Sequence, residues 1–220
     1  MAKTETAKWM DELQAKLRPF LKDQGFRMRA RTCNRETAEG LTHVINFQMG
    51  RFDPPGAPEI PGLRDNLYGM FTVNVGVCVP EINIVTGLPA SPFVHEPDCC
   101  IRRRLGHLSG STDVWWRLPA SEDIASDLRL RFDRYALPFL ARFQDRDCVL
   151  YELEHQADVT GGPPRISRAI ILATRGETDA ARELLIQQLK SASGGHAKYV
   201  QEIARRLNLG ELKPDRAKLD

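Results

Sequence analysis

Three stretches between residues 25 and 80 decide the fold: GFRMRARTCNR at 25–35, LTHVINFQMG at 41–50 and GMFTVNVGVCVP at 69–80. Each alternates large apolar residues with polar or small ones, and a period of two is typical of a β-strand that buries one face. The second and third stretches therefore predict two rows of core residues. These rows are Ile45, Phe47 and Met49, and Phe71, Val73, Val75, Val77 and Val79.

The opposite face of these strands is predicted to be polar. Thr72 and Gly76 fall on it, and the first stretch adds arginines in strict alternation. Arginine offers a rigid fork of donors for carboxylate or phosphate, and amides offer both donors and acceptors. We therefore take one set as the candidate site for a ligand or partner: Arg27, Arg29, Arg31, Arg35, Asn46, Gln48 and Asn74. The alternative interpretation is that the arginines only keep a solvated sheet face soluble.

The charge of this predicted face is unbalanced. Arg27, Arg29 and Arg31 would repel one another if they lie side by side, and no acidic row is visible on the other two strands. We expect at least one of the three to be matched by acidic residues of a distant helix, by an external anion or by an acidic partner.

These stretches also carry a family resemblance. A helix followed by GF with basic residues, then VINFQ at 44–48 and FTVNVGV at 71–77, resembles a family of small bacterial proteins known only as a domain of unknown function. Cys99, Arg104 with Leu105, and the pair Trp115–Trp116 look similar to later landmarks of that family. The resemblance covers roughly the first two-thirds of the chain. It implies a helix and an antiparallel sheet, and a bacterial origin, but no activity and no catalytic residue.

Composition and charge exclude few classes of protein. The 220 residues hold 31 Lys and Arg against 29 Asp and Glu, a net charge of +2, which gives no support for nucleic-acid binding. The sequence has no apolar run long enough to span a membrane, and its first residues do not resemble a signal peptide. We expect a cytoplasmic protein with no membrane partner.

The residues of catalytic and metal chemistry are scattered. No GxSxG, HExxH, Walker or GxGxxG motif is present, so no catalytic residue is assigned and an enzyme is not favoured. His95, Cys99, Cys100 and His107 have the right chemistry for zinc, but adjacent cysteines point apart and no second pair follows. We therefore expect no metal and no cofactor.

Helical periodicity and capping residues predict the remaining elements. A strand is expected at Ile82, Ile84 and Val85. Either a strand or a short helix is expected within residues 99–108. Residues 157–164 (ADVTGGPP) read as a linker, and 53–66 as a proline-rich loop. Helices are expected at 6–23, from Ser121 through Phe139, and at 148–155, 166–174, 178–190 and 196–208.

Together these elements predict an α+β protein: an antiparallel sheet of three to five strands packed by helices, plus a C-terminal helical hairpin. We divide the chain into an α+β domain at 1–160 and a helical cap or appendage at 161–220. The oligomeric state is left open.

Three functions stay open. The first is a non-enzymatic protein-interaction module, such as an accessory or immunity-like partner, that uses the polar sheet face or the terminal helices. The second is a binder of a small anion. The third is an enzyme on a phosphorylated or nucleic-acid substrate, for which no general base can be named. A deep polar pocket on the arginine face would favour a ligand, and an exposed apolar patch on the terminal helices a protein partner.

Overall fold

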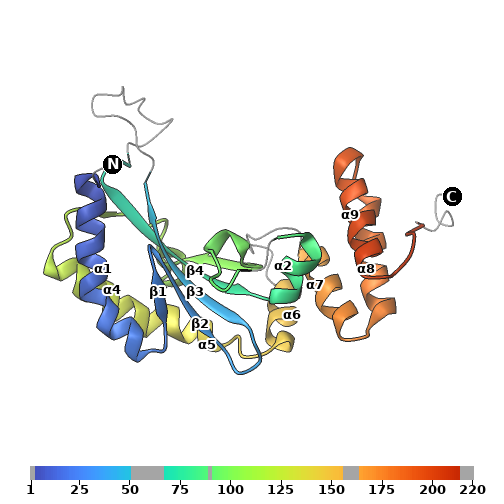
Figure 1. Cartoon of the computed structure of the whole chain (residues 1–220), viewed down its shortest axis with the longest axis horizontal. Coiled ribbons are helices and arrows are strands. Elements are labelled where there is room, and N and C mark those ends of the chain that lie inside the picture. The colour runs from blue at the N-terminus through green and yellow to red at the C-terminus, as the bar shows by residue number, and fades with distance from the viewer. Residues whose placement is uncertain (1–2, 51–66, 89–90, 156–163, 214–220) are drawn as a thin grey trace.

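The computed structural model describes residues 3–50, 67–88, 91–155 and 164–213. Its centre is an antiparallel sheet in the order β1-β2-β3-β4-β5, with β6 pairing with the other end of β4 (Figure 1). The predicted α+β class with an antiparallel sheet is therefore confirmed. The strands are β1 Arg27–Arg29, β2 Thr32–Glu36, β3 Thr42–Met49, β4 Met70–Cys78, β5 Ile101–Arg104 and β6 Trp116–Arg117.

The first predicted strand is in fact a hairpin. The chain reverses at Ala30, whose φ of 49° lies in the left-handed region, so β1 pairs with β2 and Arg29 faces Thr32. Gln14 of the N-terminal helix donates a hydrogen bond to the carbonyl oxygen of Ala30 and anchors this turn. Arg31 consequently lies in the turn and not on a strand, which corrects the prediction of three arginines along one strand.

One face of the sheet is covered by helices, as predicted. These are α1 Glu5–Asp23, α4 Glu122–Arg131, the π-helical turn η2 Phe132–Ala136 and α5 Leu137–Ala141. The ring of Phe47 meets that of Phe132 edge-on with centroids 6.3 Å apart, and Phe20 of α1 stacks on the same ring. The predicted core positions Phe47, Val73, Val75 and Val77 are all buried.

The segment after β4 departs from the prediction, because residues Pro80–Thr86 form the helix α2 and not a strand. Pro80 begins the helix, where its missing N–H costs nothing, and Gly87 ends it with a left-handed φ of 86°. Ile82 is buried while Ile84 is exposed. A short 3-10 turn, η1 Glu96–Asp98, precedes β5, and the helical turn α3 Leu105–Leu108 follows it, so residues 99–108 contain both a strand and a short helix.

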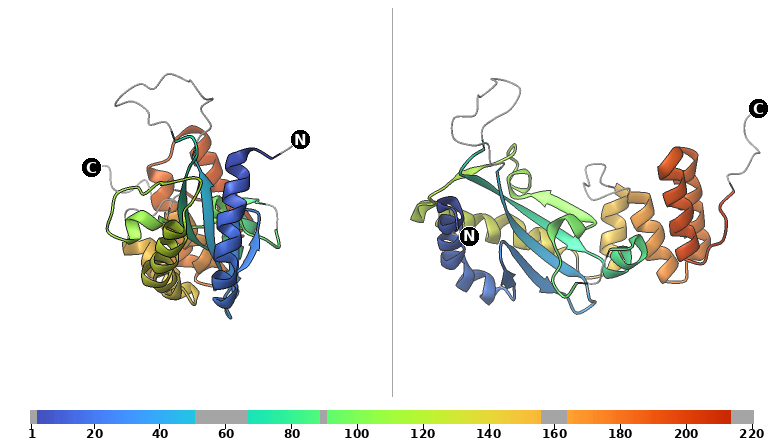
Figure 2. Two further views of the ribbon diagram at one scale, coloured as in Figure 1. Left: turned by 90° about the vertical axis from the view of Figure 1, so that its left-hand side faces the viewer. Right: turned by 45° about the horizontal axis from the view of Figure 1, so that its top comes forward.

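Four helices complete the described chain: α6 Arg146–His155, α7 Pro164–Thr174, α8 Thr178–Lys190 and α9 Gly194–Arg206. They match the predicted helices to within about two residues, and Figure 2 shows α7, α8 and α9 stacked beyond one end of the sheet. The predicted linker and domain boundary near residue 160, like the loop 53–66, lie outside the described residues.

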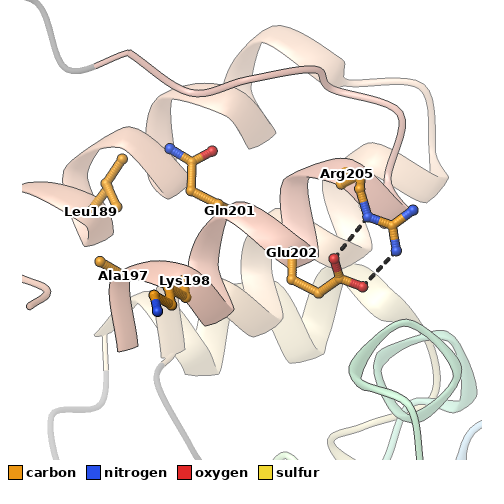
Figure 3. A pocket seen from close by; sticks show the side chains of 6 residues that line it. All are labelled: Leu189, Ala197, Lys198, Gln201, Glu202 and Arg205. Carbon is orange, nitrogen blue, oxygen red and sulfur yellow. Dashed lines mark hydrogen bonds and ion pairs between the residues drawn. The ribbon is translucent and has the colours of Figure 1, made fainter. Parts of the chain in front are cut away.

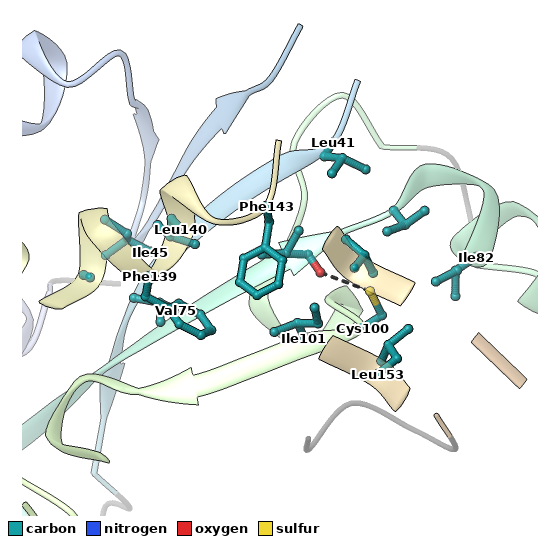
Figure 4. Packing of buried hydrophobic residues seen from close by; sticks show 14 of the residues in the cluster. Leu41, Ile45, Val75, Ile82, Cys100, Ile101, Phe139, Leu140, Phe143 and Leu153 are labelled. Carbon is teal, nitrogen blue, oxygen red and sulfur yellow. Dashed lines mark hydrogen bonds between the residues drawn. The ribbon is translucent and has the colours of Figure 1, made fainter. Parts of the chain in front are cut away.

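The apolar core runs from the sheet into the helical part. Figure 4 shows Phe143, Ile101 and Cys100 from the sheet region beside Ile82 of α2 and Leu153 of α6. The thiol of Cys100 donates to the carbonyl oxygen of Val77 at 3.4 Å. Within the described residues, the structure contains no helix long and apolar enough to cross a membrane.

Candidate ligand pocket on the polar sheet face

Strand register arranges the polar face of the sheet in rows. One row crosses all five strands, because Arg29 pairs with Thr32, Thr32 with Asn46, Asn46 with Asn74 and Asn74 with Arg104. Gln48 and Thr72 face each other one row further on. A parallel row contains Arg27, Asn34, Val44, Gly76 and Arg102. The structure thus brings five predicted site residues to one face: Arg27, Arg29, Asn46, Gln48 and Asn74.

Most polar side chains of the central row form hydrogen bonds with one another or with a neighbouring residue. Asn46 donates to the hydroxyl of Thr32 at 2.9 Å, and Asn74 donates to the amide oxygen of Gln48 at 2.8 Å. At the far end, Arg104 binds both carboxylate oxygens of Asp113, at 2.7 and 2.5 Å. These amides hold the sheet face together, and they do not converge on a common cavity.

Arg35 does not belong to this face. It neighbours Asn34 along the strand, so it points to the opposite side of the sheet. There its guanidinium lies 4.7 Å from the ring centre of Phe26 and donates to the carbonyl oxygen of Gln24 at 3.1 Å. Arg35 therefore has a structural role beside the core, and we exclude it from the candidate site.

The expected internal match for the arginines is not found among the described residues. The side chains of Arg27, Arg29 and Arg31 have no hydrogen bond or ion pair with the described residues. An external anion or acidic partner stays a prediction for these side chains.

A pocket of about 670 Å³ opens on the polar face, at the end of the sheet where α2 begins. Its floor comes from the sheet and its walls from α2, Leu88 and the segment 91–98. Arg27 is the one residue of the predicted set that lines it. The lining residues are Arg27, Asn34, Glu36, Gly40, Thr42, Cys78, Pro80, Asn83, Ile84, Leu88, Ser91, Pro92, Val94, His95 and Asp98.

Two contacts hold the wall segment 91–98 over the sheet. Asn34 donates to the carbonyl oxygen of Val94 at 3.0 Å and accepts from its amide at 2.7 Å. Glu96, which is only 5% exposed, forms a double ion pair with Arg102 at 2.6 and 3.0 Å. Both anchors come from the row that begins at Arg27, so the pocket is built by the sheet itself.

The polar groups of the lining include one thiol and a reciprocal pair of hydrogen bonds in the wall segment. The thiol of Cys78 accepts a hydrogen bond from Asn83 at 3.2 Å, and burial raises its pKa to about 12. It is therefore protonated at neutral pH and a poor nucleophile. Asp98 accepts from the amide of His95 at 3.3 Å, and the His95 side chain accepts in return from the Asp98 amide.

The four side chains weighed as zinc ligands do not form a metal cluster. Cys99 packs with Val44 and Cys78 on the polar side, whereas Cys100 belongs to the main core. Within the part of the chain that the structure describes, no group of three His, Cys, Asp or Glu side chains is placed to hold a metal.

A second hollow of about 420 Å³ lies between α8 and α9, lined by Leu189, Ala197, Lys198, Gln201, Glu202 and Arg205 (Figure 3). Its carboxylate, Glu202, is already bound by Arg205 at 2.6 Å and by Arg206 at 2.8 Å. These hydrogen bonds lower the pKa of Glu202 to about 2. The one carboxylate among the described lining residues of this hollow is already engaged by two arginines, which makes it the weaker candidate.

Comparison with known proteins finds one family. Residues 63–142 match the model of a family described as a domain of unknown function (DUF4304). The predicted resemblance to a domain of unknown function is confirmed for this range, whereas the N-terminal helix, GF and VINFQ, on which the prediction also drew, precede it. The matched range supplies Cys78, α2 and the wall segment 91–98 of the pocket, while β1, β2 and β3 precede it. No curated protein and no solved structure matches the chain.

Sequence reasoning missed most of the pocket. Asn34 and Glu36 share the face of Arg27, and strand alternation could have placed them there. The residues of α2 and the segment 91–98 carried no such signal, because tertiary contacts bring them over the sheet.

Proposed function

We propose that this chain is a binding protein for a small molecule, which it holds in the pocket between the polar sheet face, α2 and the segment 91–98. The observation that carries this proposal is the pocket of about 670 Å³, into which four strands and the helix α2 bring polar side chains. Its size falls within the range of about 300–1,000 Å³ typical of small-molecule sites.

The lining supports binding more than catalysis. The buried thiol is held protonated, and the His95 side chain already accepts a backbone hydrogen bond from Asp98. Catalysis needs a positioned base or an activated nucleophile. The groups of this pocket favour recognition of a ligand.

A ligand screen tests the proposal. The full-length chain is heated with a panel of amino acids, organic acids, nucleotides, sugar phosphates and polyamines, each at millimolar concentration, and the melting temperature is recorded. We expect at least one compound to raise it, because a ligand at about 100 times its Kd adds about 2.7 kcal/mol to the free energy of unfolding.

Two variants show whether the pocket is responsible. Thr42→Trp places an indole in the pocket and should abolish the rise, whereas Gln48→Trp, on the same face of β3 outside the lining, should keep it. If no compound stabilises the wild-type chain, or if both variants respond like wild type, the proposal is wrong.

A protein-interaction module is the second candidate function. Its support is the exposure of Ile84 and Leu88 beside the pocket, at 66% and 42%. On the described part of the terminal helices, Tyr199 is the one exposed large hydrophobic residue, so those helices offer little support. A protein partner that covers the pocket mouth would give no stabilisation by any small molecule.

We also propose a cytoplasmic location and a bacterial origin. All five cysteines carry free thiols, which fits a reducing compartment. The bacterial origin rests on the family resemblance alone.

A further inference from the structure

Resting on the proposed function, we infer that the ligand is an amino-acid-like zwitterion with an aliphatic side chain. Its carboxylate would be bound by Arg27 and its ammonium group by Glu36. Its side chain would lie against the apolar residues Ile84, Leu88, Pro92 and Val94. The inference concerns the class of ligand at the site described above.

The first step is the placement of two opposite charges. Arg27 pairs with Asn34 across the hairpin, and Glu36 lies two residues beyond Asn34 on the same face. The Cα atoms of such diagonal neighbours on one face of an antiparallel pair lie about 7–8 Å apart. Both side chains line the pocket and are exposed, yet neither has a hydrogen bond or ion pair among the described residues. One cation and one anion are thus left available side by side at the same cavity.

The second step is the charge of the whole lining. Besides Arg27, the described lining carries the carboxylates of Glu36 and Asp98, and the His95 side chain is engaged by the backbone amide of Asp98. A ligand that carries only negative charge would meet two carboxylates against one guanidinium. Electrostatic complementarity favours a molecule with both signs of charge. This argument revises the predicted small anion.

The third step is the apolar wall. Ile84 and Leu88 flank the cavity with exposed side chains, and Val94 and Pro92 face it from the other segment. A ligand that covers these side chains removes apolar surface from water, which contributes roughly 25 cal/mol for each Å² buried. An aliphatic group beside the two charges fits this arrangement.

Four leucine derivatives separate these contributions by isothermal titration of the full chain. Leucine carries both charges, N-acetylleucine only the carboxylate, leucine amide only the ammonium group, and N-acetylleucine amide neither. We expect leucine to bind most tightly, each singly charged compound at least about tenfold more weakly, and the neutral compound weakest.

Charge-neutral variants assign each group. Arg27→Gln should remove the preference for leucine over leucine amide, and Glu36→Gln the preference for leucine over N-acetylleucine. Arg29→Gln and Glu39→Gln are matched controls, because these residues neighbour the two sites but do not line the pocket. Both controls should keep the wild-type order of affinities.

The outcomes distinguish the inference from the proposed function. The four leucine compounds could bind equally or not at all, while another compound of the screen stabilises the wild-type chain but not Thr42→Trp. In that case the pocket binds a ligand of different chemistry, and the zwitterion inference is wrong. If nothing in the screen or the leucine series binds, both are wrong. If Arg27→Gln and Glu36→Gln leave the order of affinities unchanged, these two residues do not recognise the charges.

Discussion

At the scale of single residues, His43 shows how the core tolerates a polar group. The ring is 1% exposed, its Nε2 lies 2.7 Å from the carbonyl oxygen of Phe143, and its Nδ1 lies 3.2 Å from the guanidinium of Arg35. The contacts fix one tautomer: Nε2 donates to the carbonyl, and Nδ1 accepts from the arginine. A second proton on Nδ1 would face a cation in a buried site.

This arrangement predicts a pH-dependent stability. Burial chiefly, with a smaller contribution from the nearby Arg35, lowers the pKa of His43 to about 4, against the hydrogen bond to Phe143, which raises it. The unfolded chain binds the proton near pH 6.5 and the folded chain near pH 4, so acidification through this window favours unfolding. The loss should approach about 3 kcal/mol. The measurement is the free energy of unfolding by urea at intervals from pH 7 to 4.

His43→Gln isolates this contribution from the carboxylates that titrate nearby. Glutamine keeps a donor for Phe143 and an acceptor for Arg35 but does not bind a proton in this range. The variant should lose less free energy than wild type between pH 6.5 and 4. Equal losses in both chains would mean that His43 is not the titrating group.

At the scale of elements, β2 and β5 each anchor the wall segment 91–98 with one side chain, and Asn34 of β2 is the anchor at Val94. Asn34 is 4% exposed and supplies both hydrogen bonds to Val94. Asn34→Ala should loosen the segment, because two hydrogen bonds of about 1 kcal/mol each are lost. Hydrogen–deuterium exchange should then speed up at the Val94 amide.

A neighbouring asparagine provides the control for this prediction. Asn46→Ala removes contacts to Thr32 and to the carbonyl oxygen of Arg31, and it does not touch the segment. Exchange at Val94 should stay at its wild-type rate in this variant. Unchanged exchange in Asn34→Ala would show that other contacts hold the wall.

The same elements show how far sequence reasoning reaches. Strand alternation predicted β3, β4 and their core residues correctly, because successive side chains point to opposite faces of the sheet. It did not predict that β4 is buried on both faces, with Thr72 and Asn74 buried as well. It missed the turn at Ala30, since alanine rarely adopts a positive φ and gives no local signal. It also took residues 82–85 for a strand, because Ile82 and Ile84 alternate as strand residues do. The helix start at Pro80 and the end at Gly87 decided otherwise.

The candidate site was predictable in part for a related reason. Arg27 was identified because its face follows from alternation within one strand. The rest of the pocket depends on contacts such as Asn34 with Val94, which lie 60 residues apart in the chain. A contact between residues so far apart in the chain leaves no pattern in the local sequence.

At the scale of the whole molecule, α2 joins the pocket to the terminal helices. Glu81 of α2 forms a double ion pair with Arg146 of α6, at 2.5 and 2.9 Å, and Arg206 of α9 donates to the carbonyl oxygen of Val85 at 2.8 Å. Figure 1 shows α2 beside α7 at the end of the sheet. Ile166, Ile170 and Ile171 of α7 belong to the same apolar cluster as the sheet. The terminal helices thus share an apolar cluster and polar contacts with the rest of the molecule, and we predict that they unfold together with the sheet.

A substitution in α7 tests this unity, because the three tryptophans of the chain lie elsewhere, at positions 9, 115 and 116. Ile170 is fully buried, so Ile170→Ala should cost about 2–5 kcal/mol. If the chain unfolds as one cooperative unit, the midpoint temperature of unfolding, followed by tryptophan fluorescence, should fall by roughly 2–4 °C for each kcal/mol lost. Val75→Ala, in the sheet core, should lower the same transition through a loss of about 1–3 kcal/mol. Ile84→Ala, on an isoleucine that is 66% exposed, should leave it nearly unchanged. If Ile170→Ala leaves the fluorescence transition at its wild-type temperature while Val75→Ala lowers it, the terminal helices unfold on their own and are a separate domain.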